Sequence, residues 1–375
     1  MRGLADLRRK RAGLGGNKPL RQQSSAILVC VIGAGDFEDS SFYADDVEIN
    51  GYEVQPGANL ELADLKGAYL RFAQLRDANF TGANLIGANL ECADLKGTKF
   101  TGAQLTGANL ATASLVGALL WGANLEGANL ERTQLRLCNL LDADLRFANL
   151  EGADFSDANL TGSNLSGASS VDGVRFETNL RFANLKRARL VRTNLSFANL
   201  DHADLSEADL RFANLYGAFL SNANFSGADL SDSNLQVANF RDSVFTGAAL
   251  LGADLNRAFL KKVDLSGANL AATNLAATNL EGANLTGADL EGANLEEAYL
   301  RKAKLQGANL EQANLHYASL IGADLSGANL SDANLSGADL TGANLWRANL
   351  SGVDLENTTL EEATFSPQDR PWRPR

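Results

Sequence analysis

Hydrophobic residues recur along most of this chain with a period of five. From Ala58 to Phe365, Leu or Phe stands at nearly every position divisible by five, and Ala usually stands two residues earlier. On an α-helix, five residues advance about 500°, so successive leucines would lie about 140° apart and would form no stripe. A straight strand would place them alternately on opposite faces. The pattern therefore predicts a backbone that turns once in every five residues.

Each pentapeptide has the pattern of a minimal strand followed by a corner. In the run from Gly82 to Ile86, Ala83 and Leu85 share one face and Asn84 lies on the other. Coils built from such sides and stacked about 4.8 Å apart would satisfy their backbone N–H and C=O groups between neighbouring coils. Ala and Leu would point inward, and Asn or Asp and the two corner residues outward. Glycine is frequent at the second corner position, where it suits a positive φ. It is not obligatory there, because the same position also holds Phe72, Phe147, Phe182, Phe197, Phe212 and Tyr317.

Runs such as Ala123-Asn124-Leu125-Glu126-Gly127 resemble the A(D/N)LXX repeat of the pentapeptide-repeat family. The resemblance covers residues 56–365 without a gap. It implies an all-β fold, a right-handed quadrilateral β-helix with four pentads per coil. The array would then form about 15 coils in a rod about 75 Å long. The spacing of opposite charges along the chain does not by itself distinguish four sides from three.

The five prolines indicate where the array begins and ends. All of them lie at or outside its limits, as expected if neighbouring coils need every interior N–H, and Pro56 and Pro367 mark the ends. We interpret residues 1–23 as a basic disordered tail and 366–375 as a Pro/Arg-rich tail. Residues 24–55 would hold a strand and either a degenerate capping coil or an irregular cap, since solenoid ends need special capping repeats. Hydrophobic residues five apart support the capping coil, namely Phe37, Phe42, Val47 and Tyr52.

Composition narrows the class of protein and its compartment. A hydrophobic content of 45% argues against disorder, and the glycines do not recur at every third position as in collagen. The three cysteines, Cys30, Cys92 and Cys138, show no CxxC spacing, which favours a reducing, cytoplasmic location. No apolar stretch approaches the roughly 20 residues that span a bilayer. An exported protein is the alternative, if the segment from Ala26 to Gly35 belongs to a signal peptide.

The sequence shows no constellation of catalytic residues. His202 and His316 both fall at corner positions, and neither has a nucleophile or metal ligand at a usable spacing. Gly33-Ala34-Gly35 follows an apolar segment but lacks the third glycine of a dinucleotide-binding fingerprint. Cys138 occupies an inward Ala position, and Cys92 a corner. We therefore expect no enzyme, and no catalytic, cofactor-binding or metal site.

The formal net charge is -12, and its distribution suggests two roles. With four sides, the acidic excess falls on two adjacent sides, which contain Leu70, Leu90 and Leu110, and Leu75 and Leu95. These charges can simply keep a long rod soluble. The family resemblance implies another role, since some members resemble duplex DNA and bind type II topoisomerases. Duplex DNA would carry roughly 44 charges over this length, several times more than the acidic sides. The resemblance also implies that such inhibitors dimerise through a C-terminal helix, and residues 366–375, with three prolines, are not expected to form one.

One segment breaks the pattern. Ser170 and Arg175 occupy five-fold positions, while Val171 and Phe176 come one residue late. Burying Arg175 without a partner would be costly, so we expect a local bulge. Six basic residues fall within 18 positions here and form a basic collar around the rod: Arg175, Arg181, Lys186, Arg187, Arg189 and Arg192.

The basic collar has two interpretations. It is a binding site for a partner, or acidic residues one coil away neutralise it. For the second interpretation, a 20-residue offset predicts the pairs Arg181–Asp201, Arg187–Glu207, Arg189–Asp209 and Arg192–Asp172. Such exposed pairs contribute about 0 to 1 kcal/mol each.

The sequence thus predicts a non-enzymatic rigid scaffold that presents flat solenoid faces to a protein partner of unknown identity. The alternative is a DNA-mimicking inhibitor or protector of a type II topoisomerase (gyrase). Unpaired strand edges at the C-terminal end predict a homodimer through that end. Direct binding of nucleic acid and a membrane span are not expected.

Overall fold

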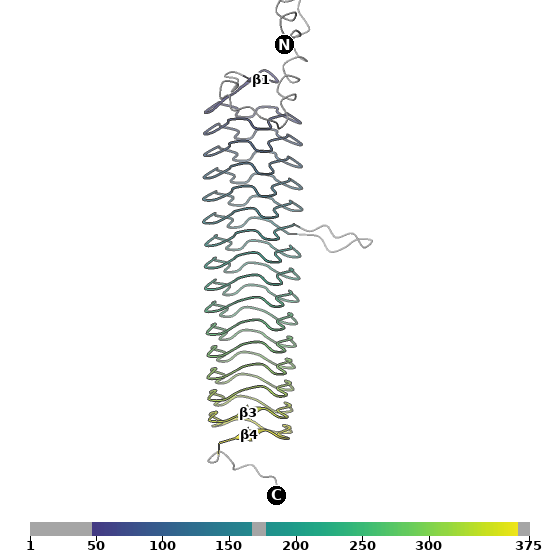
Figure 1. The fold of residues 1–375 in the computed structure, drawn as a ribbon, viewed down its shortest axis with the longest axis vertical. Helices are drawn as coiled ribbons and strands as arrows, with labels where there is room; N and C mark the ends of the chain where they lie inside the picture. The colour runs from purple at the N-terminus through teal and green to yellow at the C-terminus, as the bar shows by residue number, and fades with distance from the viewer. Residues whose placement is uncertain (1–46, 167–177, 367–375) are drawn as a thin grey trace, which may run out of the picture.

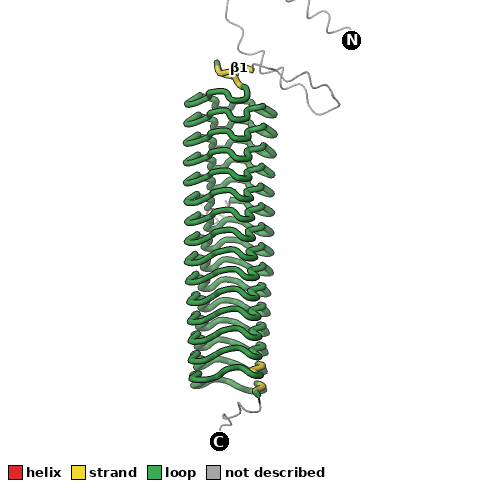
Figure 2. The backbone as a smooth tube through the Cα atoms, turned by 90° about the vertical axis from the view of Figure 1, so that its left-hand side faces the viewer, coloured by secondary structure: helices red, strands yellow, loops and turns green. Residues whose placement is uncertain are grey.

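The computed structural model describes residues 47–166 and 178–366, and these residues stack as coils into one straight rod (Figure 1). Each pentad forms a parallel bridge with the pentad 20 residues further on, as in Asn59↔Asn79 and Asn79↔Lys99. Four pentads therefore make one coil, which confirms the four-sided architecture. Figure 2 shows the same stack from a second side, with almost all of the chain classed as loops and turns.

Regular strands occur only near the two ends of the described chain. Strands β1 (Val47–Ile49) and β2 (Tyr52–Val54) pair antiparallel as a hairpin. Strands β3 (Asn344–Leu345) and β4 (Thr364–Phe365) pair parallel. Elsewhere in the described chain each side of a coil contributes a single bridging residue between two corners.

The backbone of one pentad shows how the coils satisfy their hydrogen bonds. The N–H of Leu85 donates to the C=O of Gln104 in the next coil at 2.7 Å, and the N–H of Asn84 donates to the C=O of Ala63 in the previous coil at 2.9 Å. At the corner, the N–H of Ala88 donates to the C=O of Leu85 at 3.0 Å, which closes a β-turn. The same pattern repeats along the array, so neighbouring coils bond to each other on every side.

The Asn or Asp before each inward Leu completes the corner. Its side-chain oxygen accepts a hydrogen bond from the N–H two residues later, as Asn89 does from Glu91 at 3.1 Å. This local bond is typical of Asx turns and explains why short polar residues recur at this position. Many of the asparagines also donate through Nδ2 to the side chain 20 residues earlier, as Asn214 does to Asn194 at 3.2 Å. Ladders of amides thus run along the outside of the rod.

The second corner residue has a positive φ in every described pentad of the array, whether or not it is glycine. Phe72 has a φ of 62° and Val237 a φ of 52°. This left-handed conformation costs an L-residue roughly 1–2 kcal/mol and is least favourable for a β-branched side chain. The prediction that glycine is convenient there without being obligatory is confirmed.

Val237 offers a direct test of this backbone strain. We expect Val237→Gly to raise the free energy of unfolding by up to about 1 kcal/mol, because relief of strain exceeds the added entropy of the unfolded chain. The reverse change, Gly87→Val, should lower it, since Gly87 has a φ of 64° and open space around its missing side chain. Urea unfolding of both variants measures the difference. Equal stabilities would contradict a strained corner at Val237.

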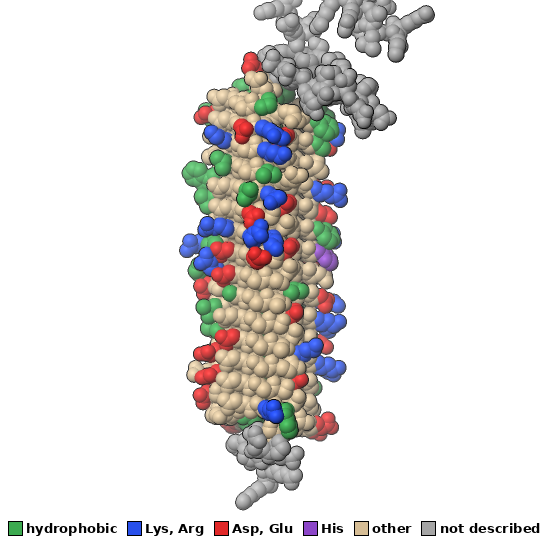
Figure 3. All heavy atoms as spheres, turned by 60° about the vertical axis from the view of Figure 1, so that its left-hand side comes forward, with side chains coloured by type: hydrophobic (Ala, Val, Ile, Leu, Met, Phe, Trp, Pro, Cys, Tyr) green, Lys and Arg blue, Asp and Glu red, His purple; other side chains and the backbone are tan. Residues whose placement is uncertain are grey.

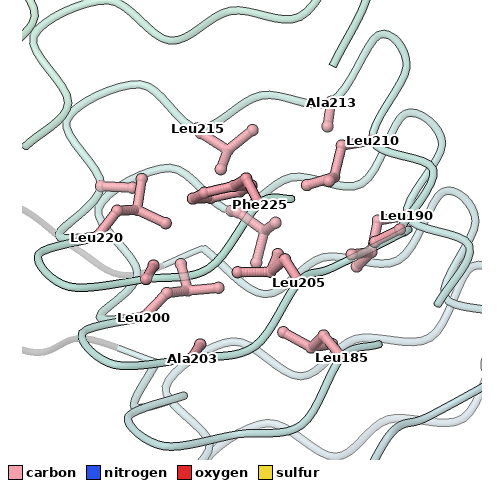
Figure 4. Packing of buried hydrophobic residues seen from close by; sticks show 14 of the residues in the cluster. Leu185, Leu190, Leu200, Ala203, Leu205, Leu210, Ala213, Leu215, Leu220 and Phe225 are labelled. Atoms are coloured by element: carbon pink, nitrogen blue, oxygen red, sulfur yellow. The ribbon is translucent and has the colours of Figure 1, made fainter. Parts of the chain in front are cut away.

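The core is a column of Ala and Leu side chains from all four sides, with exposures near zero (Figure 4). Phenylalanines fill wider sections of the column, and the rings of Phe225 and Phe245 stack with centroids 4.5 Å apart. Where Ser or Thr replaces Ala, its hydroxyl donates to a nearby carbonyl, as Thr133 does to Leu110 at 2.8 Å. The inward and outward positions predicted from the sequence are those found.

The two ends of the rod differ. At the N-terminal end, the hairpin of β1 and β2 lies against the first coil, and Asn50 Nδ2 donates to the C=O of Asp64 at 3.2 Å. Val47 and Tyr52, two of the four residues that supported a capping coil within residues 24–55, lie in this antiparallel hairpin. The capping coil itself stays a prediction, because residues 24–46 lie outside the described residues. At the C-terminal end, the inward side chains are only partly buried, in contrast to the same positions upstream: Leu350, Val353, Leu355, Leu360, Ala363 and Phe365.

The break in the pattern changes the stacking of the coils. The bulge predicted between Ser170 and Phe176 lies outside the described residues, but its flanks show that the bridging offset rises from 20 to 30 residues, as in Asn149↔Asn179. This corrects the expectation that the 20-residue offset continues through the break. The flanking sides therefore stack as if ten residues were absent, and in the sequence these ten residues have Ser170 and Arg175 in place of Leu or Phe at the five-fold positions.

A hydroxyl group closes the coil where a backbone carbonyl is missing. The N–H of Phe147 donates to Thr178 Oγ1 at 2.9 Å, and this hydroxyl lies 3.1 Å from the C=O of Ser166. At the end of the array, Ser366 Oγ accepts the N–H of Arg347 at 2.7 Å in the same way. Both hydroxyls replace the carbonyl that the next coil would otherwise supply.

Deleting residues 167–176 should leave the rod intact. The deletion joins Ser166 to Glu177, which restores a two-residue corner before Thr178 and keeps the pentad register. We expect the melting temperature measured by circular dichroism to stay unchanged or to rise slightly. Deleting residues 166–176 leaves a one-residue corner and should lower the melting temperature strongly. Similar melting temperatures for the two deletions would contradict the shift in bridging offset.

Candidate interaction surface

The described residues offer no catalytic arrangement. Among them, no group of three or more His, Cys, Asp or Glu side chains lies close enough together to hold a metal ion. His316 Nδ1 lies 2.8 Å from Ser336 Oγ, and His202 stacks on Phe182 with ring centroids 5.1 Å apart. Burial raises the pKa of the Cys138 thiol to about 12, which keeps it protonated as a core residue.

The structure places the basic collar on a single coil. Arg181 lies on the corner after Leu180, and Lys186 and Arg187 lie on the next corner. Arg189 and Arg192 belong to the following side, where Arg189 bridges to Asp209. The collar thus covers three of the four sides of the coil. The sixth residue, Arg175, lies outside the described residues.

Two collar residues are neutralised by carboxylates. Arg187 Nε lies 2.7 Å from Asp157 Oδ1, and its Nη2 lies 3.0 Å from Oδ2, so the contact is bidentate. Lys186 Nζ lies 3.2 Å from Glu207 Oε1. The sequence-based pair Arg187–Glu207 is therefore replaced by two others, because the 30-residue offset brings Asp157 next to Arg187. For the same reason the corner of Arg192 stacks on the corner of Gly162 in the preceding coil. The expected partner of Arg192, Asp172, lies outside the described residues.

The other described collar residues have no salt bridge to an acidic residue of the described chain. Arg181 lies 5.1 Å from the centre of the Phe182 ring, and Arg192 lies 5.4 Å from that of Phe212. Arg189 faces Asp209, but the carboxylate of Asp209 binds Arg211 at 2.7 Å. Cation–π contacts at exposed sites contribute about 0.5–1 kcal/mol and leave the guanidinium accessible.

The collar surface also contains aromatic residues, which its definition by basic residues did not include. Phe182 is 52% exposed and Phe212 is 49% exposed, and each ring lies beside a collar arginine. The sequence indicates these contacts through residues that occupy the same corner position 20 residues apart. Such pairs are Phe182 with His202, and Arg192 with Phe212. Recognising them required the four-sided register.

The Arg187–Asp157 pair predicts a pH dependence of stability. The hydrogen bond and charge of Arg187 hold the pKa of Asp157 below its ordinary value. A carboxylate with a lowered pKa stabilises the folded state above its unfolded pKa, about 3.9, and this contribution is lost as the pH falls through the folded value. We expect Arg187→Gln to lower the melting temperature at pH 7, with the difference from the wild type vanishing well below pH 4. Lys66→Gln, which removes no salt bridge, should show no such pH dependence; an equal response would contradict the pairing.

The acidic sides predicted from the sequence are not continuous. The side of Leu70, Leu90 and Leu110 continues into that of Leu180, because the break shifts the register by half a coil. The acidic residues that the sequence analysis assigned to this side after the break lie instead on the side of Leu190, which stacks on that of Leu160. These residues are Asp209, Asp229, Asp232, Asp289, Glu291, Glu311 and Asp332. Figure 3 shows one face of the rod, where a large tan area carries neither charged nor hydrophobic side chains. The acidic surface is therefore shorter than the rod.

Comparison with known proteins identifies the repeat. The family model for pentapeptide repeats matches residues 56–169, 176–261 and 264–366 through overlapping matches. No curated protein matches the chain. Among solved structures, HetL is a pentapeptide repeat protein involved in heterocyst differentiation regulation from the cyanobacterium Nostoc sp. strain PCC 7120. It is 35% identical, with 62% of this chain and 91% of HetL covered and a TM-score of 0.26.

Two further structures are similar. A pentapeptide repeat protein from the Arabidopsis thaliana thylakoid lumen is 28% identical, with 31% of this chain and 66% of that chain covered and a TM-score of 0.23. Full-length QnrB1, a plasmid-mediated fluoroquinolone resistance protein, is 18% identical, with 68% and 94% covered and a TM-score of 0.19. The TM-scores are low, so family membership rests on the repeat itself. The matched residues make up most of the chain, which therefore belongs to the pentapeptide-repeat family and forms its right-handed quadrilateral β-helix.

Proposed function

We propose that this protein is a non-enzymatic rigid scaffold whose flat faces bind a protein partner, with the basic collar as a contact site. The observation that supports this most directly is the pair of arginines, Arg181 and Arg192, which lie on exposed phenylalanine rings and form no salt bridge within the described part of the chain. Arginine and aromatic residues are the side chains that most often dominate binding energy at protein interfaces. A long, bonded stack of coils holds them in fixed positions.

A charge reversal tests this proposal. We expect Arg181→Glu with Arg192→Glu to weaken recovery of the partner in a pull-down from the native host, with no change in the circular dichroism melt. These two are better targets than Arg187, whose reversal would place two carboxylates together at Asp157. The matched control is Lys302→Glu with Arg347→Glu, two exposed corner residues outside the collar. Unchanged recovery by the collar variant would contradict the proposal.

The second candidate is a DNA-mimicking inhibitor or protector of a type II topoisomerase. Its support is the acidic side that follows Leu190 beyond the break, although part of that charge is neutralised, as in Asp209 with Arg211. A gyrase supercoiling assay distinguishes the two proposals. Inhibition or protection at micromolar protein would support mimicry, and its absence would leave the scaffold.

We further propose that two copies associate through the C-terminal end of the rod, where the last coil leaves its apolar side chains partly exposed. Direct binding of nucleic acid is not part of this proposal. Among the described residues, no helix is long and apolar enough to cross a membrane. A cytoplasmic location, or export through the segment from Ala26 to Gly35, stays a prediction.

A further inference from the structure

A groove lies on the side of the rod that contains Arg181, beginning two coils beyond the basic collar. It has a volume of about 400 Å³ and spans several coils. We call it the central groove, and the lining residues that matter here are Phe219, Asn239, Phe259, Asn279, Arg241 and Lys261. None of them was singled out by the sequence. Their arrangement combines aromatic faces, amides and cations on a rigid backbone.

Aromatic residues recur along this side at every second coil. Parallel bridges connect Phe219, Asn239, Phe259, Asn279 and Tyr299 in that order. With coils about 4.8 Å apart, the aromatic positions follow each other at about 9.6 Å. Phe259 is 52% exposed and Tyr299 is 58% exposed. Phe259 and Tyr299 therefore present their rings to solvent at a fixed distance, and the half-buried Phe219 lies at the same distance on the other side of Phe259.

The aromatic residues also interrupt the ladder of amides. Elsewhere an asparagine donates to the polar side chain 20 residues earlier, as Asn234 does to Asn214 at 3.2 Å. The residue 20 positions before Asn239 is Phe219, and the residue 20 positions before Asn279 is Phe259. A phenylalanine side chain has no acceptor, so neither asparagine can make this hydrogen bond. Both use their side-chain oxygen locally, accepting from the N–H of Arg241 and of Glu281, respectively. Within the described chain their Nδ2 donors have no partner and are available to a ligand.

Cations lie along the edge of the central groove. Arg241 and Lys261 belong to its lining, which contains no carboxylate. Arg241 Nε lies 3.2 Å from Asp242, and Lys261 Nζ lies 2.9 Å from Glu281; both side chains remain partly exposed. Lys262 lies on the next corner position. Lys262 forms no salt bridge in the described chain, so three cations face the two carboxylates that pair with Arg241 and Lys261, and the remaining positive charge favours an acidic ligand.

We propose that the central groove binds an acidic, proline-rich segment of a partner protein in the polyproline II conformation. Three residues of this helix make one turn of about 9.3 Å, which matches the distance between aromatic positions. An extended strand repeats its side chains at about 6.7 Å and an α-helix at 5.4 Å, so neither matches.

The chemistry of such a segment fits the remaining groups. Polyproline II makes no internal hydrogen bonds, so its carbonyls accept from donors such as Asn239 and Asn279. Its prolines pack on aromatic rings, as in other aromatic-lined grooves that recognise this helix. Acidic residues of the segment face Arg241 and Lys261. The proposal rests on the scaffold function and names one class of partner for a second surface.

A synthetic peptide tests the proposal on the purified full chain. We expect a fluorescent peptide of four Glu-Pro-Pro repeats to bind saturably, measured by fluorescence anisotropy at low salt. Peptides of Lys-Pro-Pro and of Glu-Gly-Gly should bind at least tenfold more weakly, since they lack the charge or the preformed helix. Absence of saturable binding, or equal binding of the Glu-Gly-Gly peptide, would overturn the proposal. Because no host partner is needed, this result is independent of the pull-down at the collar.

Phe259→Asn is designed to weaken peptide binding without destabilising the fold. Phe259→Asn removes a ring and restores the amide ladder from Asn239 to Asn279, so the melting temperature should not fall while peptide binding weakens at least tenfold. Tyr69→Asn makes the same kind of change at the same pentad position far from the central groove, and should leave binding unchanged. Undiminished binding by Phe259→Asn would overturn the proposal.

Discussion

Leu215→Asp should unfold a large part of the rod. Leu215 is fully buried in the apolar column, where a carboxylate would have neither a cation nor water. The expected loss in free energy of unfolding exceeds about 4 kcal/mol, the range reached by buried unpaired charges. Each coil is held by its neighbours, so the damage should separate the array into two weaker parts. Thermal unfolding followed by circular dichroism should show a much lower transition.

The neighbouring corner residue is the control. Tyr216 is 37% exposed, and its ring meets that of Phe197 edge to face with centroids 5.5 Å apart. Tyr216→Asp loses this contact, which contributes about 0.5–1.5 kcal/mol, and buries no charge. Comparable melting temperatures for the two variants would overturn the assignment of inward and outward positions.

The second large effect concerns mass. We expect light scattering of the full chain to show a species of about 80 kDa, twice the 39.7 kDa of one copy. The last coil exposes apolar side chains such as Leu360 and Phe365, together with the edge of β4, and such edges pair with other chains. Contact of this end with itself gives a closed two-fold dimer.

Variants at the C-terminal end should change the oligomeric state measured by light scattering. Leu360→Glu should give the monomer, because it places a charge in the apolar contact, whereas Leu251→Glu changes an exposed corner residue and should leave the dimer. Deleting residues 367–375 should favour the dimer further, because it removes polar and charged residues that follow the apolar end. The deletion must spare Ser366, which holds the N–H of Arg347. A strict monomer at high concentration, unchanged by the deletion, would contradict a free end.

The sequence by itself determined the local structure of every side. The geometry of helices and strands, applied to the five-residue spacing, predicts inward Ala and Leu and a two-residue corner in each pentad. Leu85 and Asn84 lie as predicted. The role of Asn89 at its corner also follows from local chemistry, since it bonds two residues away. Such features depend on residues within one pentad, so they are readable without knowing what lies beside it. The number of sides came from the family resemblance, because charge spacing fits three sides as well as four.

Only the tertiary structure decided which pentads lie side by side. Identical sides stack equally well in any register, so nothing in the repeat itself states that the offset becomes 30 residues after Leu165. That shift gives Arg187 the partner Asp157 and breaks the acidic sides in two. The same stacking aligns Phe219 with Phe259 across two coils and leaves Asn239 between them. Contacts between coils join residues 20 or 30 apart, and their chemistry exists only once the stack has formed.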